Sequence, residues 1–290
     1  MNLPAHPLWA WLPEAADGTV FGGKAAGLAR ATRAGLPVPR GIALSTELVD
    51  LIVANDAAAA EDIKAAVTTL GESLAVRSSA SGEDGASASF AGQYLTRLGV
   101  RPNKVAHVVA EVAGSATTAS AAAYRVRMGL GAAPAMAVVI QAMVPADVAG
   151  VMFTRDPRTG APERVIEASY GLGETVVAGL VVPDLYRLTP AGCLLEERIA
   201  DKDLLVRVAE PGGTEQIAVP ASQARTAALT KAALAELVHL AEQCELTFGQ
   251  SCDVEWAWSA TGLSLLQCRP MTRLTRRRAD QGRTLSEDAP

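Results

Sequence analysis

The chain has 290 residues and a mass of 30.0 kDa, which is enough for a well-packed core in one large domain or in two lobes. Hydrophobic residues make up 49% of the sequence and charged residues 20%, and this excludes a disordered or collagen-like chain. Because 26 basic residues stand against 31 acidic ones, the net charge of −5 argues against a dedicated nucleic-acid-binding protein, whose phosphate contacts need a basic surplus.

The first half of the chain alternates helical and extended patterns. An Ala- and Leu-rich run after Gly22 predicts a helix that ends at Gly35, where two prolines follow. The segment 79–92 is rich in Gly, Ser and Ala, has no periodicity, and is predicted to be a loop. Further patterns predict strands at 41–45 and 73–78, helices at 46–55 and 57–70, and two helices between 102 and 129.

From about residue 133 onward, extended patterns dominate. We expect strands at 135–143, 148–154, 165–168 and 185–188, a long helix at 222–244 and a closing hairpin at 252–269. The polar run at the end of the chain has mixed charge and is predicted to be frayed. The sequence therefore predicts an α+β fold in two lobes, residues 1–132 and 133–274, with a disordered tail at 275–290.

The same sequence gives expectations about location. Its start has no basic leader or long apolar run, and no apolar stretch approaches the roughly 18 residues of a membrane-spanning helix. Its four cysteines lack the CxxC spacing of redox or metal motifs, which favours a reducing compartment. We expect a cytoplasmic protein that neither crosses a membrane nor binds nucleic acid.

The closing hairpin predicts a charged site. A three-residue loop ending at Gly262 places Asp253 opposite Arg269, and Glu255 opposite Gln267, with all four side chains on one sheet face. Carboxylate and amide oxygens beside a guanidinium suit Mg²⁺ and phosphate, although the same pattern also fits a solvated sheet face with one ion pair. The opposite face is predicted to be core and comprises Val254, Trp256, Trp258, Leu266 and Cys268.

Two basic residues in the first half lie beside small-residue turns. Lys24 follows Gly22-Gly23 at a predicted helix start, where the ammonium and the helix N-terminus would both attract phosphate. Arg77 ends a predicted strand just before the Gly/Ser-rich loop, and a guanidinium there suits phosphate contact. Neither segment is a Walker A motif, and each alone also fits an ordinary surface position.

In this order, the motifs resemble the N-terminal ATP-binding module of the phosphoenolpyruvate synthase and pyruvate phosphate dikinase family, which rifampin phosphotransferases also use. The resemblance covers roughly residues 21–272 and implies a two-lobed ATP-grasp fold with the nucleotide bound between the lobes. The matching stretches are GGKAAGLARATRAGLPVPRGIAL (22–44), LAVRSSASGEDGASASFAGQ (74–93), VIQAMVPADVAGVMFTRDPRTG (139–160), VIEASYGLGETVVAGLVVPDLY (165–186) and CDVEWAWSATGLSLLQCRPMT (252–272).

The resemblance also implies a role for each matching residue, with ATP and Mg²⁺ as cofactors. Lys24 and Arg77 would hold the ATP phosphates, and Arg269 would neutralise charge on the transferred phosphate, so these three are the expected catalytic residues. Glu255 and Gln267 would bind Mg²⁺. The remaining nucleotide contacts are Ser81 and Gly82 in a closing loop, Gln141, Met143 and Val144 beside adenine, Glu167 as a ribose or positioning contact, and Asp253 as a supporting acid.

The family further implies partners. Its complete members phosphorylate a histidine on a swivelling domain, which carries the phosphoryl group to a distant acceptor site. None of His6, His107 and His239 lies in the sequence setting of that histidine. We therefore expect a module that phosphorylates a separate swivelling-domain protein, which serves an acceptor subunit and a small-molecule acceptor. Two alternatives stay open: a stand-alone ATP-dependent kinase or ligase acting on a small molecule, and a non-catalytic nucleotide-binding protein.

Overall fold

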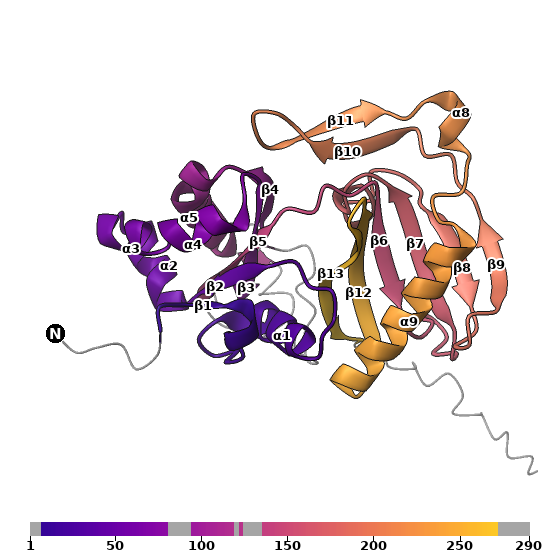
Figure 1. Ribbon diagram of the computed structural model, residues 1–290, viewed down its shortest axis with the longest axis horizontal. Helices are drawn as coiled ribbons and strands as arrows, with labels where there is room; N and C mark the ends of the chain where they lie inside the picture. The colour runs from indigo at the N-terminus through magenta and orange to yellow at the C-terminus, as the bar shows by residue number, and fades with distance from the viewer. Residues whose placement is uncertain (1–6, 81–93, 119–121, 124–134, 272–290) are drawn as a thin grey trace, which may run out of the picture.

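The computed structural model describes residues 7–80, 94–118, 122–123 and 135–271. These residues form two lobes that lie side by side, each built on its own antiparallel sheet (Figure 1). The first sheet has five strands, in the order β1 (Trp9–Trp11), β2 (Gly41–Leu44), β5 (Met136–Ala142), β3 (Leu74–Ala80) and β4 (Thr96–Val100). The predicted α+β class and two-lobed form are confirmed.

Helices cover both faces of the first sheet. On one face, a large core is closed by α2 (Thr46–Val53), α3 (Ala57–Asp62), α4 (Lys64–Leu70) and α5 (Val105–Gly114). On the other face lies α1 (Gly22–Arg33), which also contacts the second lobe. Three short 3₁₀ turns lie at Leu12–Glu14, Pro102–Lys104 and Ser115–Thr117.

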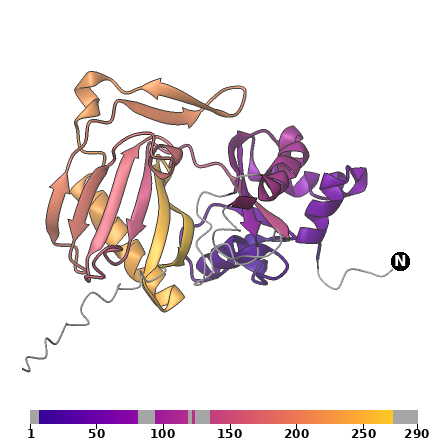
Figure 2. The same ribbon diagram turned by 180° about the vertical axis from the view of Figure 1, so that it is seen from behind.

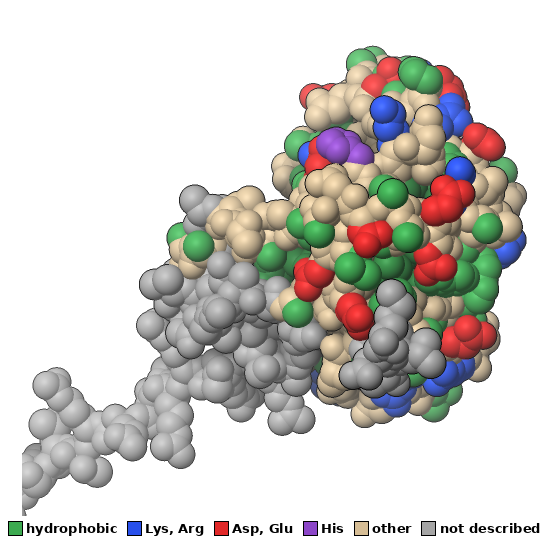
Figure 3. Space-filling view, turned by 90° about the vertical axis from the view of Figure 1, so that its left-hand side faces the viewer, with side chains coloured by type: hydrophobic (Ala, Val, Ile, Leu, Met, Phe, Trp, Pro, Cys, Tyr) green, Lys and Arg blue, Asp and Glu red, His purple; other side chains and the backbone are tan. Residues whose placement is uncertain are grey.

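Helix α2 shows how the sequence sets these elements. The hydroxyl of Ser45 accepts a hydrogen bond from the Leu48 N–H at 3.2 Å and so caps the N-terminus of the helix. Leu48, Val49 and Ile52 are buried, whereas Glu47 and Asp50 remain exposed. The outer face of the first lobe carries acidic side chains spread among hydrophobic and other ones (Figure 3).

The second sheet has six strands, and α9 (Lys231–Phe248) covers one of its faces, as both ribbon views show (Figures 1 and 2). Met152, Ile166, Tyr186, Val254 and Trp256 are fully buried beneath this helix. The strand order is β13 (Gly262–Pro270), β12 (Cys252–Ser259), β6 (Val148–Phe153), β7 (Arg164–Tyr170), β8 (Asp184–Leu188) and β9 (Leu194–Arg198).

A separate hairpin and two short helices complete the second lobe. The hairpin consists of β10 (Leu204–Val208) and β11 (Thr214–Ala218) and extends from the second lobe toward β4 of the first (Figure 1). The short helices are α7 (Glu174–Val177) and α8 (Ala221–Ala224). Within the described residues, no helix combines the length and hydrophobicity needed to cross a bilayer.

The structure corrects the predicted lobe boundary between residues 132 and 133. That boundary assigns the strand at 135–143 to the second lobe, but β5 lies in the first sheet, hydrogen-bonded between β2 and β3. The chain passes to the second sheet only between β5 and β6. A Gly/Pro break marks a loop, and a loop can join two elements of one lobe as readily as two lobes. The predicted tail at 275–290 lies outside the described residues.

Other expectations hold with smaller changes. The predicted helix at 57–70 is two helices that meet at Ile63. The predicted long helix at 222–244 begins later, because the Thr230 hydroxyl accepts a hydrogen bond from the Ala233 N–H at 3.2 Å and caps α9 there. Strands β1, β4, β9, β10 and β11 were not predicted, and most of the second helix expected between 102 and 129 lies outside the described residues.

Candidate active site

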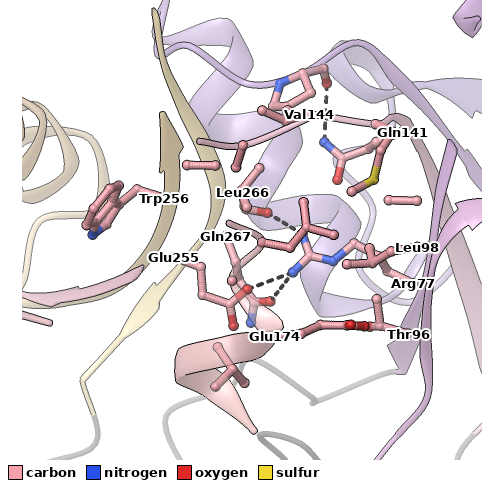
Figure 4. Close-up of a pocket in the computed structure, with 18 of the residues that line it drawn as sticks. Arg77, Thr96, Leu98, Gln141, Val144, Glu174, Glu255, Trp256, Leu266 and Gln267 are labelled. Atoms are coloured by element: carbon pink, nitrogen blue, oxygen red, sulfur yellow. Dashed lines mark hydrogen bonds and ion pairs between the residues drawn. The ribbon is translucent and has the colours of Figure 1, made fainter. Parts of the chain in front are cut away.

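A cavity of about 370 Å³ lies between the two lobes and receives side chains from both (Figure 4). Among the described residues, the charged ones that line it are Lys24, Arg77, Glu174, Glu255 and Arg269, and polar and apolar side chains line the rest. Further lining residues include Thr96, Leu98, Gln141, Met143, Val144, Leu172, Gly173, Leu266 and Gln267.

Arg77 on β3 joins the two lobes inside this cavity. Its side chain is only 10% exposed. One terminal nitrogen donates to Glu255 Oε2 at 2.9 Å and to Gln267 Oε1 at 3.0 Å, and the other donates to the carbonyl of Leu266 (Figure 4). A cation of the first lobe therefore meets the predicted metal ligands of the second lobe, although the two sets are separated by about 180 residues of chain.

The β12–β13 hairpin forms the predicted residue pairs, but its turn has a different register from the predicted one. Asp253 lies opposite Arg269 and Glu255 opposite Gln267, as expected. The turn, however, pairs Ser259 with Gly262, one position away from the predicted register. A β-bulge between Glu255 and Trp256 absorbs the extra residue and restores the expected pairs.

The bulge decides which leucine enters the core. Leu265 pairs with Trp256 and is fully buried, whereas Leu266 is half-buried and lines the interlobe cavity. The expectation that Leu266 belongs to the core face was therefore wrong, because an alternation argument assumes a regular ladder. A bulged residue has no ladder partner, and here the Leu266 carbonyl accepts from Arg77 instead.

Arg269 is held by the neighbouring acid. Its Nε and Nη2 both donate to Asp253 Oδ2, at 3.0 and 2.6 Å. Burial raises the pKa of the Asp253 carboxyl, while Arg269 opposes that shift. Arg269 lines the cavity and Asp253 does not, so Asp253 acts on the site by orienting the guanidinium.

Lys24 reaches the cavity because α1 and β3 approach closely. Gly22 has a φ of +80°, and a Cβ there would lie 1.6 Å from the Ser79 carbonyl oxygen, so only glycine fits. The Ser79 hydroxyl donates to the Phe21 carbonyl at 2.7 Å and accepts from the Ala25 N–H at 3.0 Å. These contacts fix the first turn of α1, and Lys24, 5% exposed, lines the cavity from that turn.

The predicted adenine contacts also line the cavity. Gln141, Met143 and Val144 lie at the end of β5 and just beyond it. The Gln141 side-chain amide donates to the Pro39 carbonyl at 3.2 Å, which fixes the orientation of the amide beside the cavity (Figure 4). The two predicted loop contacts, Ser81 and Gly82, lie outside the described residues.

The cavity contains a different carboxylate from the one predicted near the ribose. Glu167 lies on the same sheet face as Glu255, two strands away with Val151 between them, and it does not line the cavity. Glu174, at the start of α7, does line it and lies near Thr96 on the opposite wall (Figure 4). Burial raises the pKa of Glu174. The sequence reasoning missed Glu174, although the glycine-rich turn directly before it was a signal that could have pointed to this position.

The donor set at the hairpin fits Mg²⁺. Oxygen atoms of Glu255 and Gln267 accept from the same Arg77 nitrogen, so both ligand atoms converge on one point. One carboxylate and one amide oxygen suit a hard cation that takes its remaining ligands from phosphate and water. Among the described residues, no group of three or more His, Cys, Asp or Glu side chains could hold a metal on its own.

Comparison with known proteins identifies the class. Residues 44–288 match the family model described as pyruvate phosphate dikinase, AMP/ATP-binding domain, and the chain belongs to this family. The resemblance seen in the sequence is thereby confirmed.

Its curated relatives have several named activities. The chain is 37% identical over 219 residues to a probable phosphoenolpyruvate synthase from Archaeoglobus fulgidus, covering 74% of this chain and 29% of that protein. It is 37% identical over 281 residues to a prodigiosin synthesizing transferase from Serratia marcescens (87% and 31%) and 36% identical over 230 residues to a rifampicin phosphotransferase from Streptomyces sviceus (78% and 26%). The chain thus spans about a quarter to a third of the length of these three relatives.

Among solved structures, D-alanyl-alanine synthetase A from Vibrio cholerae aligns with a TM-score of 0.40 at 11% identity, over 91% of this chain and 58% of that one.

Proposed function

We propose that this chain is an ATP-dependent phosphotransferase module that binds Mg·ATP in the interlobe cavity and phosphorylates a histidine on a swivelling-domain partner. The observation that carries the proposal is the meeting of Arg77 from the first lobe with Glu255 and Gln267 from the second. A cation and metal-ligating oxygens on facing walls suit a triphosphate with its bound metal. Family membership in an AMP/ATP-binding domain supports the choice of nucleotide.

The lining residues suggest how ATP lies in the cavity. Adenine would occupy the side formed by Gln141, Met143 and Val144, where a polar amide borders apolar side chains. The ribose hydroxyls would donate to the carboxylate of Glu174. This assignment replaces the one expected for Glu167, which lies outside the cavity.

The triphosphate would then extend toward Lys24, Arg77 and Arg269. These three cations come from different elements and are each largely buried, so their charges act on the phosphates with little screening. Glu255 and Gln267 would hold Mg²⁺, which supplies charge neutralisation and alignment of the phosphate oxygens when bound. Asp253 keeps Arg269 in place through the two hydrogen bonds to its Oδ2. Phosphoryl transfer needs positioning and charge compensation more than covalent help, and these residues provide both.

The proposed phosphoryl acceptor is a histidine of the partner and neither of the two histidines among the described residues of this chain. His107 and His239 are exposed, stand near carboxylates of their own helices, and do not line the cavity. In the proposed step, an imidazole nitrogen of the partner attacks a phosphorus atom of ATP. The phosphorus–oxygen bond to the leaving group breaks, the leaving oxygen keeps the electron pair, and the imidazole gives up its proton to water.

The test combines the chain with Mg²⁺, ATP carrying radioactive phosphorus, and the purified histidine-carrying domain of a phosphoenolpyruvate synthase. We expect label on that domain that is labile in acid and stable in base, and no label when its histidine is replaced by alanine. Label at the β or γ position of ATP identifies which phosphate moves. Rapid ATP consumption with a small molecule and no histidine domain would contradict the proposal, as would a complete lack of transfer to the domain.

A further inference from the structure

The β10–β11 hairpin extends from the second lobe to β4 of the first (Figures 1 and 2). None of its residues is among the described residues that line the cavity. Its tip nevertheless contacts β4, which forms one wall of the cavity, and the middle of β10 contacts the segment 171–172, which leads into another wall. We infer that this hairpin is a strap whose backbone contacts position the two cavity walls that hold the nucleotide.

The tip of the strap docks on β4 through glycine. The Gly213 N–H donates to the Gly99 carbonyl at 2.8 Å. Gly99 has a φ of +71°, and a Cβ there would lie 2.2 Å from the Gly213 carbonyl oxygen. Such a close approach of two backbones excludes any side chain at Gly99. Thr96 and Leu98, which precede this glycine on β4, line the cavity.

The middle of β10 docks on the other wall in the same way. The Leu172 N–H donates to the Val206 carbonyl at 2.8 Å, and Gly171 forms an isolated bridge with Val206. A Cβ on Gly171 would lie 2.3 Å from the Val206 carbonyl oxygen. The three residues that follow, Leu172, Gly173 and Glu174, all line the cavity.

A buried ion pair anchors the strap to the second sheet. Lys202, just before β10, is fully buried and donates to Asp184 Oδ1 at 2.5 Å. The same carboxylate accepts from the N–H groups of Ala200 and Ala228, at 2.9 and 2.8 Å. A buried ion pair with its oxygens satisfied fixes the stem of the hairpin to the second sheet.

A charged contact fastens the tip from outside. The Arg101 guanidinium donates to Glu210 and to the Pro211 carbonyl on the strap, and also faces Glu72 with 3.8 Å between the charged atoms. The Glu210 side chain is 83% exposed, so this pair adds little to stability. Because the pair lies at the surface, substituting it can detach the tip of the strap from the first lobe without disturbing a hydrophobic core.

The inference rests on the proposed binding of ATP in the cavity and adds the residues that set the spacing of its walls. Gly99, Gly171 and Arg101 are positioning residues because none of them is among the residues that line the cavity. If the strap is released, only a fraction of molecules hold both walls at the binding spacing, and the apparent dissociation constant rises in inverse proportion to that fraction.

The first measurement needs no nucleotide. Gly99→Ala should speed hydrogen exchange of the peptide that contains the Gly213 amide, because its acceptor is displaced. Gly160→Ala is the matched control: Gly160 has a φ of +73°, and a Cβ there meets nothing within 4 Å. Unchanged exchange in Gly99→Ala would overturn the strap.

The second measurement is calorimetric titration of each variant with Mg·ATP. Gly99→Ala and Gly171→Ala should weaken binding about tenfold relative to Gly160→Ala. Arg101→Glu should weaken it about threefold, and adding Glu210→Arg should restore it, a rescue that a merely structural role would not give. If the wild-type chain binds no ATP, the proposed function fails and the strap's role fails with it. If the wild-type chain binds ATP and Gly99→Ala binds equally well, only the strap fails.

Discussion

Two hairpins flank the interlobe cavity, and they serve it in different ways. The β12–β13 hairpin supplies side chains: Glu255, Gln267 and Arg269 all line the cavity. The β10–β11 hairpin supplies none among the described residues, and its contacts at Gly99 and Gly171 are between backbones. On the proposed function, one hairpin provides the chemistry and the other provides the spacing, and substitutions should separate the two contributions.

The largest effect is expected at the chemical hairpin. Glu255→Gln removes the one carboxylate of the proposed metal site and should lower Mg-dependent transfer from ATP by about 100-fold or more. Glu167→Gln is the control, because Glu167 lies on the same sheet face two strands away and does not line the cavity. Steady-state kinetics of both variants check this, and equal losses would mean that the site extends along the sheet.

The bulge in the same hairpin gives a stability test. Leu265→Ala should lower the free energy of unfolding by about 3 kcal/mol, because it empties a fully buried position. Leu266→Ala should cost less than about 1 kcal/mol, because its side chain faces the cavity. Urea denaturation of both variants measures the difference. A regular hairpin without a bulge would reverse the order.

A substitution at Glu174 tests the role proposed for the cavity wall that follows Gly171. Glu174→Gln should weaken ATP binding about tenfold, since a carboxylate that accepts from ribose hydroxyls is replaced by a neutral amide. ATP lacking both ribose hydroxyls should bind wild-type protein more weakly but lose nothing further in the variant. Additive losses from the two changes, measured by calorimetry, would show that Glu174 acts on another part of the nucleotide.

The smallest effect concerns pH. Burial raises the pKa of Glu174 in the folded chain, so ionisation of this group costs stability. The stability that the folded chain gains from keeping Glu174 protonated is fully present below about pH 4, the range of an unperturbed glutamate. This stability is lost as the pH rises through the raised pKa. Glu174→Gln should therefore unfold at a higher temperature than wild type at neutral pH, with the gap closing in acid. A gap that widens in acid would contradict the shift.

The charged hairpin could be predicted from the sequence because side-chain alternation reports which residues share a face. That pattern correctly paired Asp253 with Arg269 and Glu255 with Gln267. It could not reveal the bulge, because a bulge changes the ladder without changing the order of residue types. Leu265 and Leu266 are identical in kind, and only their pairing separates core from cavity.

Side-chain alternation could not predict the strap or its contacts with the first lobe. Its strands carry no clear alternation, and its contacts depend on backbone approach between Gly99 and Gly213, more than a hundred residues apart. A glycine in the sequence shows freedom at its own position and says nothing about which backbone will approach it. The misplaced lobe boundary has a similar cause, since β5 joins the first sheet through long-range pairing with β2 and β3.

The most direct test of the account is a crystal structure of the chain with Mg²⁺ and a non-hydrolysable ATP analogue. The account predicts adenine beside Gln141 and Val144, and the triphosphate between Lys24, Arg77 and Arg269 with the metal on Glu255 and Gln267. A nucleotide bound elsewhere, or phosphates that contact none of these residues, would contradict it.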